Sequence, residues 1–128
     1  MIGWKEEKLI EEAVDNLAYS KVKRFYPTYI CKVTKIPLEN TFSYLLDLVE
    51  KGILILMWEI RCPDYNCNSV VHRINEINIY SNKYIQCKNC EEEILVAEDN
   101  VFPVFEIDEE YRKYIRDKKK RKNLLKAL

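Results

Sequence analysis

The chain has 128 residues, of which 48% are hydrophobic and 33% charged, the composition of one globular domain or of two small modules. The formal net charge at pH 7 is +0, so the chain as a whole lacks the basic surplus of a typical nucleic-acid-binding domain. No apolar run reaches the roughly 18 residues that a membrane helix needs, and we expect neither a membrane protein nor a disordered one.

Charge is unevenly distributed along the chain. Residues 1–60 carry a net −1, residues 61–107 a net −4 and residues 108–128 a net +5. Only the C-terminal segment therefore has the charge that contacts with phosphate require. The N-terminus is charged from Lys5 onward and lacks the apolar core and cleavage site of a secretory leader, so we expect a cytoplasmic protein.

Apolar residues repeat at helical spacing through the N-terminal part of the chain and predict three helices there. The expected ranges are residues 3–19, 28–35 and 37–51. Tyr29, Ile30 and Val33 form the expected buried face of the second helix. Gly52 is the expected stop of the third, because a left-handed residue is favoured there.

The third helix carries one apolar stripe at i, i+3, i+4, i+7 spacing, formed by Phe42, Leu45, Leu46 and Val49. Residues 53–61 follow it as an expected strand, because β-branched and aromatic residues dominate this short run. Residues 20–27, between the first two helices, are expected to be a connector.

Three short motifs in residues 28–55 match the winged helix-turn-helix family. They are the turn Ile36-Pro37-Leu38, the core Leu45-Leu46-Asp47-Leu48-Val49 and the exit Glu50-Lys51-Gly52-Ile53-Leu54. Over about residues 3–61 the chain resembles that family, which implies three helices followed by a wing strand. An unrelated three-helix cap with the same periodicity is the alternative.

Four of the five cysteines occur in two pairs at metal-ligand spacing. Cys62 and Cys67 have four residues between them, Cys87 and Cys90 have two, and nineteen residues separate the pairs. Four soft thiolates suit one Zn²⁺ ion, and four protein ligands leave no open position for water, so the expected site is structural. The alternatives are four reduced cysteines without metal, disulfides, and a catalytic or redox-active metal.

The cysteine spacing and the short strand-like runs around it resemble the zinc ribbon family over about residues 60–98. The runs are Ser69–Arg73, Lys83–Gln86 and Ile94–Ala97, with residues 74–82 joining the first two. The resemblance implies one structural Zn²⁺ ion. Two features depart from the family pattern: the first pair encloses four residues, and Asn68 and Glu91 stand where glycine is common.

Two further residues have candidate roles that we do not favour. His72 is the only histidine and lies five residues beyond Cys67, so it is a conceivable substitute ligand, but we expect an exposed strand residue. A single histidine also limits general acid–base chemistry. Cys31 is expected to be a small buried core residue rather than a reactive thiol.

The C-terminal part is expected to leave the ribbon through residues 99–107 and then to form a helix. Asp108 is its expected cap, with Tyr111, Tyr114 and Ile115 on one face. A run of five basic residues follows, namely Lys118, Lys119, Lys120, Arg121 and Lys122. This run suits either contacts with phosphate or a solvated helix end at the negative end of the dipole.

Three leucines follow the basic run, at positions Leu124, Leu125 and Leu128. Without a partner they would be exposed on a tail. An apolar cluster there favours docking onto another protein or onto a second copy of the chain.

The sequence thus predicts an α+β protein in three parts: a winged-helix-like domain over 1–61, a zinc ribbon over 62–98, and a linker with a basic helix over 99–128. This module order resembles that of the alpha subunits of archaeal transcription factor E. In that family the pair positions polymerase more than it selects a DNA sequence, which implies protein docking.

The expected function is a non-catalytic, zinc-binding adaptor or accessory subunit of a larger assembly, such as a nucleic-acid-associated or genome-defence complex. The alternative is a DNA-binding transcription regulator, in which Lys32 and Lys35 join the basic run. The third helix offers mainly Glu39, Asp47 and Glu50, which suits DNA poorly. The chain has no phosphate loop or nucleophile elbow, so we expect neither an enzyme nor a small-molecule site.

Overall fold

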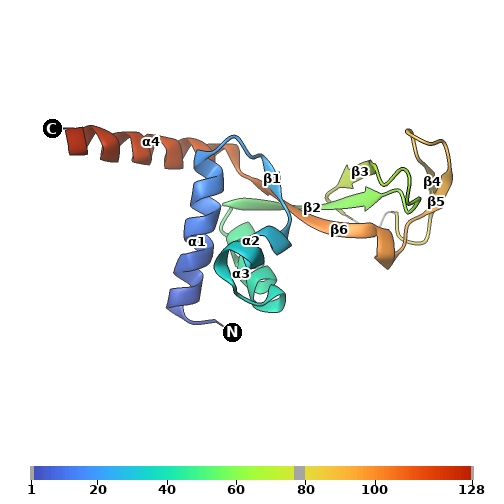
Figure 1. The fold of residues 1–128 in the computed structure, drawn as a ribbon, viewed down its shortest axis with the longest axis horizontal. Coiled ribbons are helices and arrows are strands. Elements are labelled where there is room, and N and C mark those ends of the chain that lie inside the picture. The colour runs from blue at the N-terminus through green and yellow to red at the C-terminus, as the bar shows by residue number, and fades with distance from the viewer. Residues whose placement is uncertain (1, 77–79, 128) are drawn as a thin grey trace. The chain divides into compact units, whose positions relative to one another are not determined.

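The computed structural model describes residues 2–76 and 80–127, which form a mixed α+β fold (Figure 1). The helices are α1 (Trp4–Tyr19), α2 (Pro27–Thr34), α3 (Leu38–Glu50), the short 3₁₀ helix η2 (Glu98–Asn100) and α4 (Glu109–Ala127). The strands are β1 (Arg24–Phe25), β2 (Leu54–Arg61), β3 (Val70–Ile74), β4 (Tyr84–Gln86), β5 (Glu93–Leu95) and β6 (Val101–Ile107). The predictions for residues 77–79 and for Leu128 lie outside the described residues.

The strands form two sheets. The larger has the order β1-β6-β2-β3, and the smaller pairs β4 with β5. The β1–β6, β2–β3 and β4–β5 pairs are antiparallel. Strands β6 and β2 are neighbours in the sheet although residues 62–100 separate them in the chain, so the segment that carries the paired cysteines lies between two adjacent strands.

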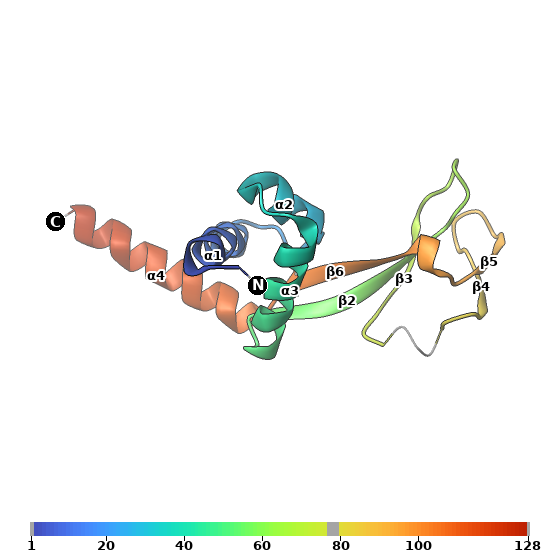
Figure 2. The same ribbon diagram turned by 90° about the horizontal axis from the view of Figure 1, so that it is seen from below.

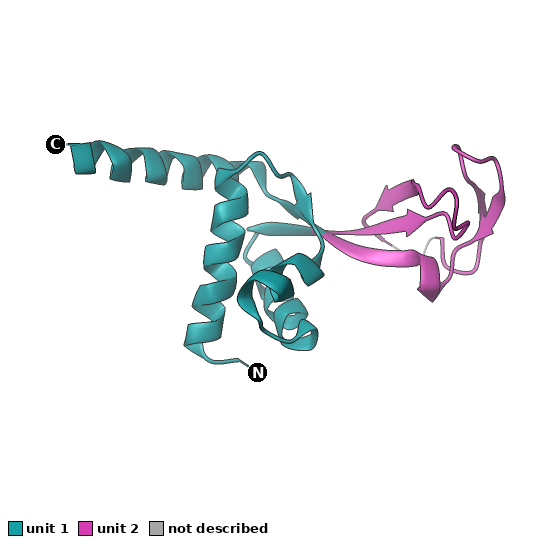
Figure 3. Cartoon of the chain, in the orientation of Figure 1, with its two compact units in different colours: residues 1–55, 105–128 teal, residues 56–104 magenta. Residues whose placement is uncertain are grey.

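Packing divides the chain into two compact units (Figure 3). Unit 1 comprises residues 1–55 and 105–128, and unit 2 comprises residues 56–104. The C-terminal helix therefore packs with the N-terminal helices. The domain limits expected from the sequence stay predictions.

The core of unit 1 forms where α1, α2 and α3 gather, as both views show (Figures 1 and 2). Its fully buried side chains include Ile10, Val14, Ile30, Leu45, Leu48, Leu54 and Phe105. The ring of Phe105 lies 5.9 Å from that of Phe25 and 5.7 Å from that of Phe42. Phe105 of β6 thus joins β1 to α3 through aromatic contacts.

The three expected N-terminal helices are confirmed, with ends within one residue of the expected ones. The expected buried face of α2 is wrong in part, because Tyr29 is 45% and Val33 52% exposed, whereas Ile30 is fully buried. The helix has only eight residues and buries Pro27 and Ile30, which are one turn apart. Because Pro27 and Ile30 face the core, Tyr29 and Val33 on another side of the helix face solvent.

The apolar stripe expected on α3 is rotated relative to the observed one. Leu45 is buried as expected, but Tyr44 and Leu48 are buried with it, and Phe42, Leu46 and Val49 are only half-buried. Thr41 is buried too and donates to the Ile36 carbonyl oxygen at 3.4 Å. A threonine can therefore lie on the buried side of α3, because its hydroxyl has a hydrogen-bond partner nearby in the chain.

Residues 99–107 were expected to be an exit segment and instead contain β6, and the expected connector 20–27 contains β1. Strand β1 pairs only with Phe105 and Glu106. Pro103, which cannot donate to a strand ladder, therefore lies beyond the reach of β1. The proline is tolerated because the sheet is unpaired on that side at this point.

A buried arginine fastens the start of α4 to the end of α1. Arg112 is only 6% exposed. Its Nη1 atom donates to the carbonyl oxygens of Leu17, Ala18 and Ser20 at 3.3, 3.1 and 2.5 Å, and its Nη2 atom donates to that of Val22. The last carbonyls of a helix have no partner within it, and they attract positive charge, so Arg112 supplies both donors and charge there.

Tyr111, beside Arg112, makes a second link to α1. Its hydroxyl donates to Asp15 Oδ1 at 2.5 Å. Burial raises the pKa of Asp15 above its ordinary value, although the hydrogen bond from Tyr111 acts in the opposite direction. The first turn of α4 is therefore held to the end of α1 and the residues after it by the hydrogen bonds of two consecutive side chains.

We expect Arg112→Met to lower the free energy of unfolding by about 3 kcal/mol, because the carbonyl oxygens of Ala18 and Val22 lose their hydrogen-bond donor. Urea denaturation followed by circular dichroism measures the change. The matched control is Arg121→Met, which removes the same group from an exposed site on the same helix and should change stability by less than about 0.5 kcal/mol. Equal stability of the two variants would contradict the role of Arg112.

Candidate metal centre

The first cysteine turn, residues 62–67, begins directly after β2. The backbone N–H of Cys62 donates to the Ser69 carbonyl oxygen at 2.9 Å, which continues the β2–β3 pairing into the turn. Asp64 closes the turn, since its carbonyl oxygen accepts from Cys67 and Asn68 at 3.0 and 2.9 Å. The two cysteines of this turn are thus brought together by backbone bonds.

The second cysteine turn, residues 87–90, begins directly after β4. The N–H of Glu91 donates to the Cys87 carbonyl oxygen, and the N–H of Cys87 donates to the Glu92 carbonyl oxygen, both at 2.8 Å. These bonds close the hairpin between β4 and β5, so the strand pairing positions Cys87 and Cys90.

The residues that stand in place of glycine adopt the conformation that glycine would favour. Asn68 has φ 46° and Glu91 has φ 66°, both in the left-handed region. Asparagine tolerates this region well, and glutamate does so at some cost. Both turns therefore end in a left-handed residue although neither has glycine there.

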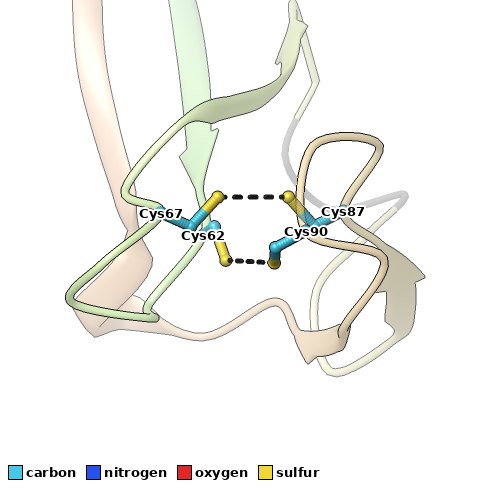
Figure 4. A group of neighbouring side chains, drawn as sticks. All are labelled: Cys62, Cys67, Cys87 and Cys90. Carbon is cyan, nitrogen blue, oxygen red and sulfur yellow. Dashed lines mark hydrogen bonds between the residues drawn. The ribbon is translucent and has the colours of Figure 1, made fainter.

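The four paired cysteines converge on one point (Figure 4). Their sulfur atoms all lie within 4.8 Å of one another, with Cys62 and Cys90 3.6 Å apart and Cys67 and Cys87 3.7 Å apart. A tetrahedral site with 2.3 Å metal–sulfur bonds has sulfur–sulfur edges of about 3.8 Å. The cluster can therefore hold one metal ion, and all five cysteines of the chain are free of disulfides.

Polar neighbours stabilise the thiolate form of one cysteine from each turn. Ser69 Oγ lies 3.2 Å from Cys67 Sγ, and Asn89 Nδ2 donates to the same sulfur at 3.2 Å. These bonds lower the pKa of Cys67 to about 6. A backbone N–H of Cys90 and the Ser69 hydroxyl lower the pKa of Cys87. Metals bind thiolates, so the lowered pKa values favour Cys67 and Cys87 as metal ligands.

The other cysteine of each turn has a raised pKa. Backbone N–H groups of Asp64 and Glu92 act to lower the pKa values of Cys62 and Cys90, but burial and the neighbouring sulfurs outweigh them. The pKa of Cys90 reaches about 12. Each turn thus contains one thiol with a lowered pKa and one with a raised pKa, the pattern expected when four thiols crowd together without a cation.

The cysteines are part of the small core of unit 2. Cys62 and Cys87 are each 1% exposed and pack with Ile60, Ile94 and Val96. The other apolar side chains of this core are only partly buried, so it contributes limited hydrophobic stabilisation by itself. A bound metal would therefore supply much of the folding energy of the unit.

His72 does not join the cluster, which among the described residues contains only the four cysteines. It lies on β3, as expected, but is half-buried rather than exposed, with its ring 5.7 Å from that of Tyr80. Cys31 lies half-buried on α2, also outside the cluster, rather than in the core as expected.

The basic residues singled out in the sequence lie on helix surfaces. Lys118, Lys120, Arg121 and Lys122 are exposed on α4, and Lys32 and Lys35 are exposed at the end of α2. None of these six makes an ion pair with another described residue. Lys119 is half-buried: it donates to Asn16 at 3.3 Å and lies 4.5 Å above the ring of Tyr19.

The leucines expected to dock a partner are exposed where the structure describes them. Leu124 is 65% and Leu125 70% exposed, near the end of α4. From Lys120 to Ala127 every residue of this helix is exposed. The helix therefore continues well past the part that packs on α1, as Figure 1 shows.

No protein-family model matches the chain, and no curated protein or solved structure matches it either. Among the described residues, no helix has the length and apolar character needed to cross a membrane.

We expect the purified protein to contain about one metal ion per chain, held by four of its five thiols. Cys87→Ser should lose the metal, and Cys31→Ser should keep it. Elemental analysis measures the metal, and iodoacetamide labelling with and without a chelator measures thiol protection. A folded Cys87→Ser protein with a full metal equivalent would contradict the site.

Proposed function

We propose that this chain is a non-catalytic adaptor or accessory subunit, in which one structural zinc ion holds unit 2 together. The observation that carries the proposal is the convergence of four cysteine sulfurs into a closed site. Four protein ligands fill a tetrahedral shell and leave no position for water or substrate, so we assign no catalytic role to the metal.

Zinc is the ion that fits the donor set best. Four thiolates select zinc or iron among the common biological metals, and zinc is the usual occupant of structural sites with four cysteines. Five cysteines without disulfides also fit a reducing compartment such as the cytoplasm. Iron in the same purified protein would redirect the proposal toward electron transfer.

We also propose that unit 1 together with β2 and β6 forms a winged helix, with the cysteine-bearing segment inserted in its wing. The element order α1-β1-α2-α3-β2 and the sheet order β1-β6-β2 support this proposal. In it, β2 and β6 are the two wing strands and residues 62–100 are the insertion between them.

The surface of α3 favours a protein partner over DNA. Its exposed positions include Glu39, Asp47 and Glu50. A groove of about 360 Å³ beside it is lined by Glu7, Glu39, Tyr44 and Asp47 among others. Three carboxylates around a groove would repel phosphate, whereas a helix that enters the major groove needs donors and positive charge.

The exposed leucines near the end of α4 are the proposed contact with the larger assembly. Leu124 and Leu125 are 65% and 70% exposed, and large exposed apolar groups on a helix commonly mark an interaction site.

Affinity purification of the tagged protein from its native cells, with nuclease treatment, tests the adaptor proposal. A stoichiometric protein partner should remain bound after nuclease, and Leu124→Asp with Leu125→Asp should release it. The matched control is Asn123→Asp with Ala127→Asp, which adds the same charge to the same segment and keeps the leucines. Equal loss of the partner from both variants would contradict docking through the leucines.

A second candidate function is DNA binding through the basic segment of α4. The observation in its favour is that Lys118, Lys120, Arg121 and Lys122 are exposed without ion-pair partners among the described residues. Their charge is therefore available to phosphate, and the contact would be independent of sequence.

Replacing residues 118–122 with glutamine should weaken binding to a random-sequence duplex and make its salt dependence flatter by about one unit for each lost phosphate contact. Fluorescence anisotropy at several salt concentrations measures both quantities. Lys32→Gln with Lys35→Gln tests in the same way whether α2 contributes. Binding that is unchanged in all variants would exclude these residues from the DNA contact.

A further inference from the structure

Unit 2 contains a cleft of about 800 Å³ that the metal site does not use. Its apolar lining comes from Trp58, Val96 and Val101, and two carboxylate residues, Glu98 and Asp99, lie on its border with Asn82. Trp58 and Val101 are half-buried, and the two acidic residues are exposed. The cleft thus combines an aromatic and aliphatic surface with negative charge at one side.

The wall that carries the carboxylates is firmly built. Glu98 and Asp99 belong to η2, which ends at Asn100. Asn100 is only 3% exposed, accepts from the Ala97 N–H at 2.8 Å and donates to the Leu95 carbonyl oxygen at 3.0 Å. A buried amide therefore fixes the turn that presents both carboxylates, and little conformational freedom is lost when a ligand binds.

Backbone bonds also fix the part of the cleft that Asn82 and Val96 line. The N–H of Asn82 donates to the Val96 carbonyl oxygen at 3.1 Å, and the N–H of Val96 donates to the Lys83 carbonyl oxygen at 2.9 Å. Val96 is 1% exposed and belongs to the same core as Cys62 and Cys87. The shape of the cleft therefore depends on the folding of unit 2 around the four cysteines.

The charge of unit 2 complements a cation. Residues 61–107 carry a net −4. Two of the four basic residues in this range, Arg61 and Arg73, pair with the buried Glu59 at 3.5 and 2.9 Å. Positive charge at the surface is thus largely limited to Lys83 and Lys88, and four zinc-bound thiolates would add a further net negative charge to the unit.

We propose that this cleft binds a lysine- and arginine-rich segment of the protein partner, an inference that rests on the adaptor function proposed above. The aliphatic stems of such side chains pack on Trp58 and Val101, and their charged ends reach Glu98 and Asp99. An arginine or lysine beside the indole gains cation–aromatic attraction as well. A phosphate backbone would instead meet two carboxylates at this surface.

Trp58 provides a direct probe of the cleft. The chain has two tryptophans, and Trp4 is 68% exposed on α1, so Trp4→Phe leaves Trp58 as the only tryptophan with little effect on the fold. Titration of this full-length variant with acetylated octa-arginine should shift the Trp58 emission saturably. An octa-glutamate peptide should leave it unchanged. Absence of a shift with octa-arginine would overturn the proposal.

Charge variants separate a built site from general attraction. Glu98→Gln with Asp99→Asn should weaken octa-arginine binding at least about fivefold. Glu92→Gln with Glu93→Gln removes the same charge from exposed positions of unit 2 outside the cleft lining and should weaken it less than about twofold. Equal weakening by the two pairs would mean general attraction and would overturn the cleft. Tighter binding of a 15-residue oligothymidine than of octa-arginine would also overturn it.

Two further outcomes separate this inference from the adaptor function. If Glu98→Gln with Asp99→Asn keeps the full amount of partner in the affinity purification, the adaptor function stands and the cleft assignment falls. If concentrated wild-type protein self-associates through contacts that the same variant abolishes, the cleft binds the basic helix of a second copy and the partner assignment is overturned.

Discussion

Arg112 places a full positive charge at a site that is almost completely closed to water, and the end of α1 makes that site favourable. Four carbonyl oxygens between Leu17 and Val22 accept its hydrogen bonds, so neither the charge nor the carbonyls are left unsatisfied. Because Arg112 follows β6 by only five residues, the same bonds hold the C-terminal part of the chain against the N-terminal helices. The C-terminal part thus comes back to the N-terminal helices, where β6 pairs with β1 and lies beside β2 in the sheet.

The sequence was sufficient where the determinant is local. Helix ends followed from periodic apolar residues and from Gly52, and the cysteine cluster followed from spacing alone. The missing parts depend on partners far away in the chain. Strand β1 has two residues, too few for a pattern, and exists because β6 pairs with it. In the sequence Arg112 cannot be told from the other cations of α4, because the carbonyl oxygens that it binds lie 90 residues or more before it.

The charges of the chain are divided among its elements. The outer side of α3 and the surface of unit 2 are acidic, whereas the last turns of α4 are basic and expose two leucines. Such a division suits a protein that binds partners of different charge through different surfaces. It also explains why a net charge of +0 gives little information about partners. With Glu39, Asp47 and Glu50 exposed on it, α3 is among the elements least suited to contact phosphate.

The insertion of unit 2 between two adjacent strands has a kinetic consequence. Pairing Phe25 with Phe105 joins residues that are 80 positions apart, and long loops are slow to close. If unit 2 folds first around the proposed metal, its 49 residues no longer contribute to the flexible loop, which shortens to about 31 residues. The entropic cost of closure then falls by about 0.8 kcal/mol. With the proposed metal, metal supply would therefore speed the closure of unit 1, which contains none of the four clustered cysteines.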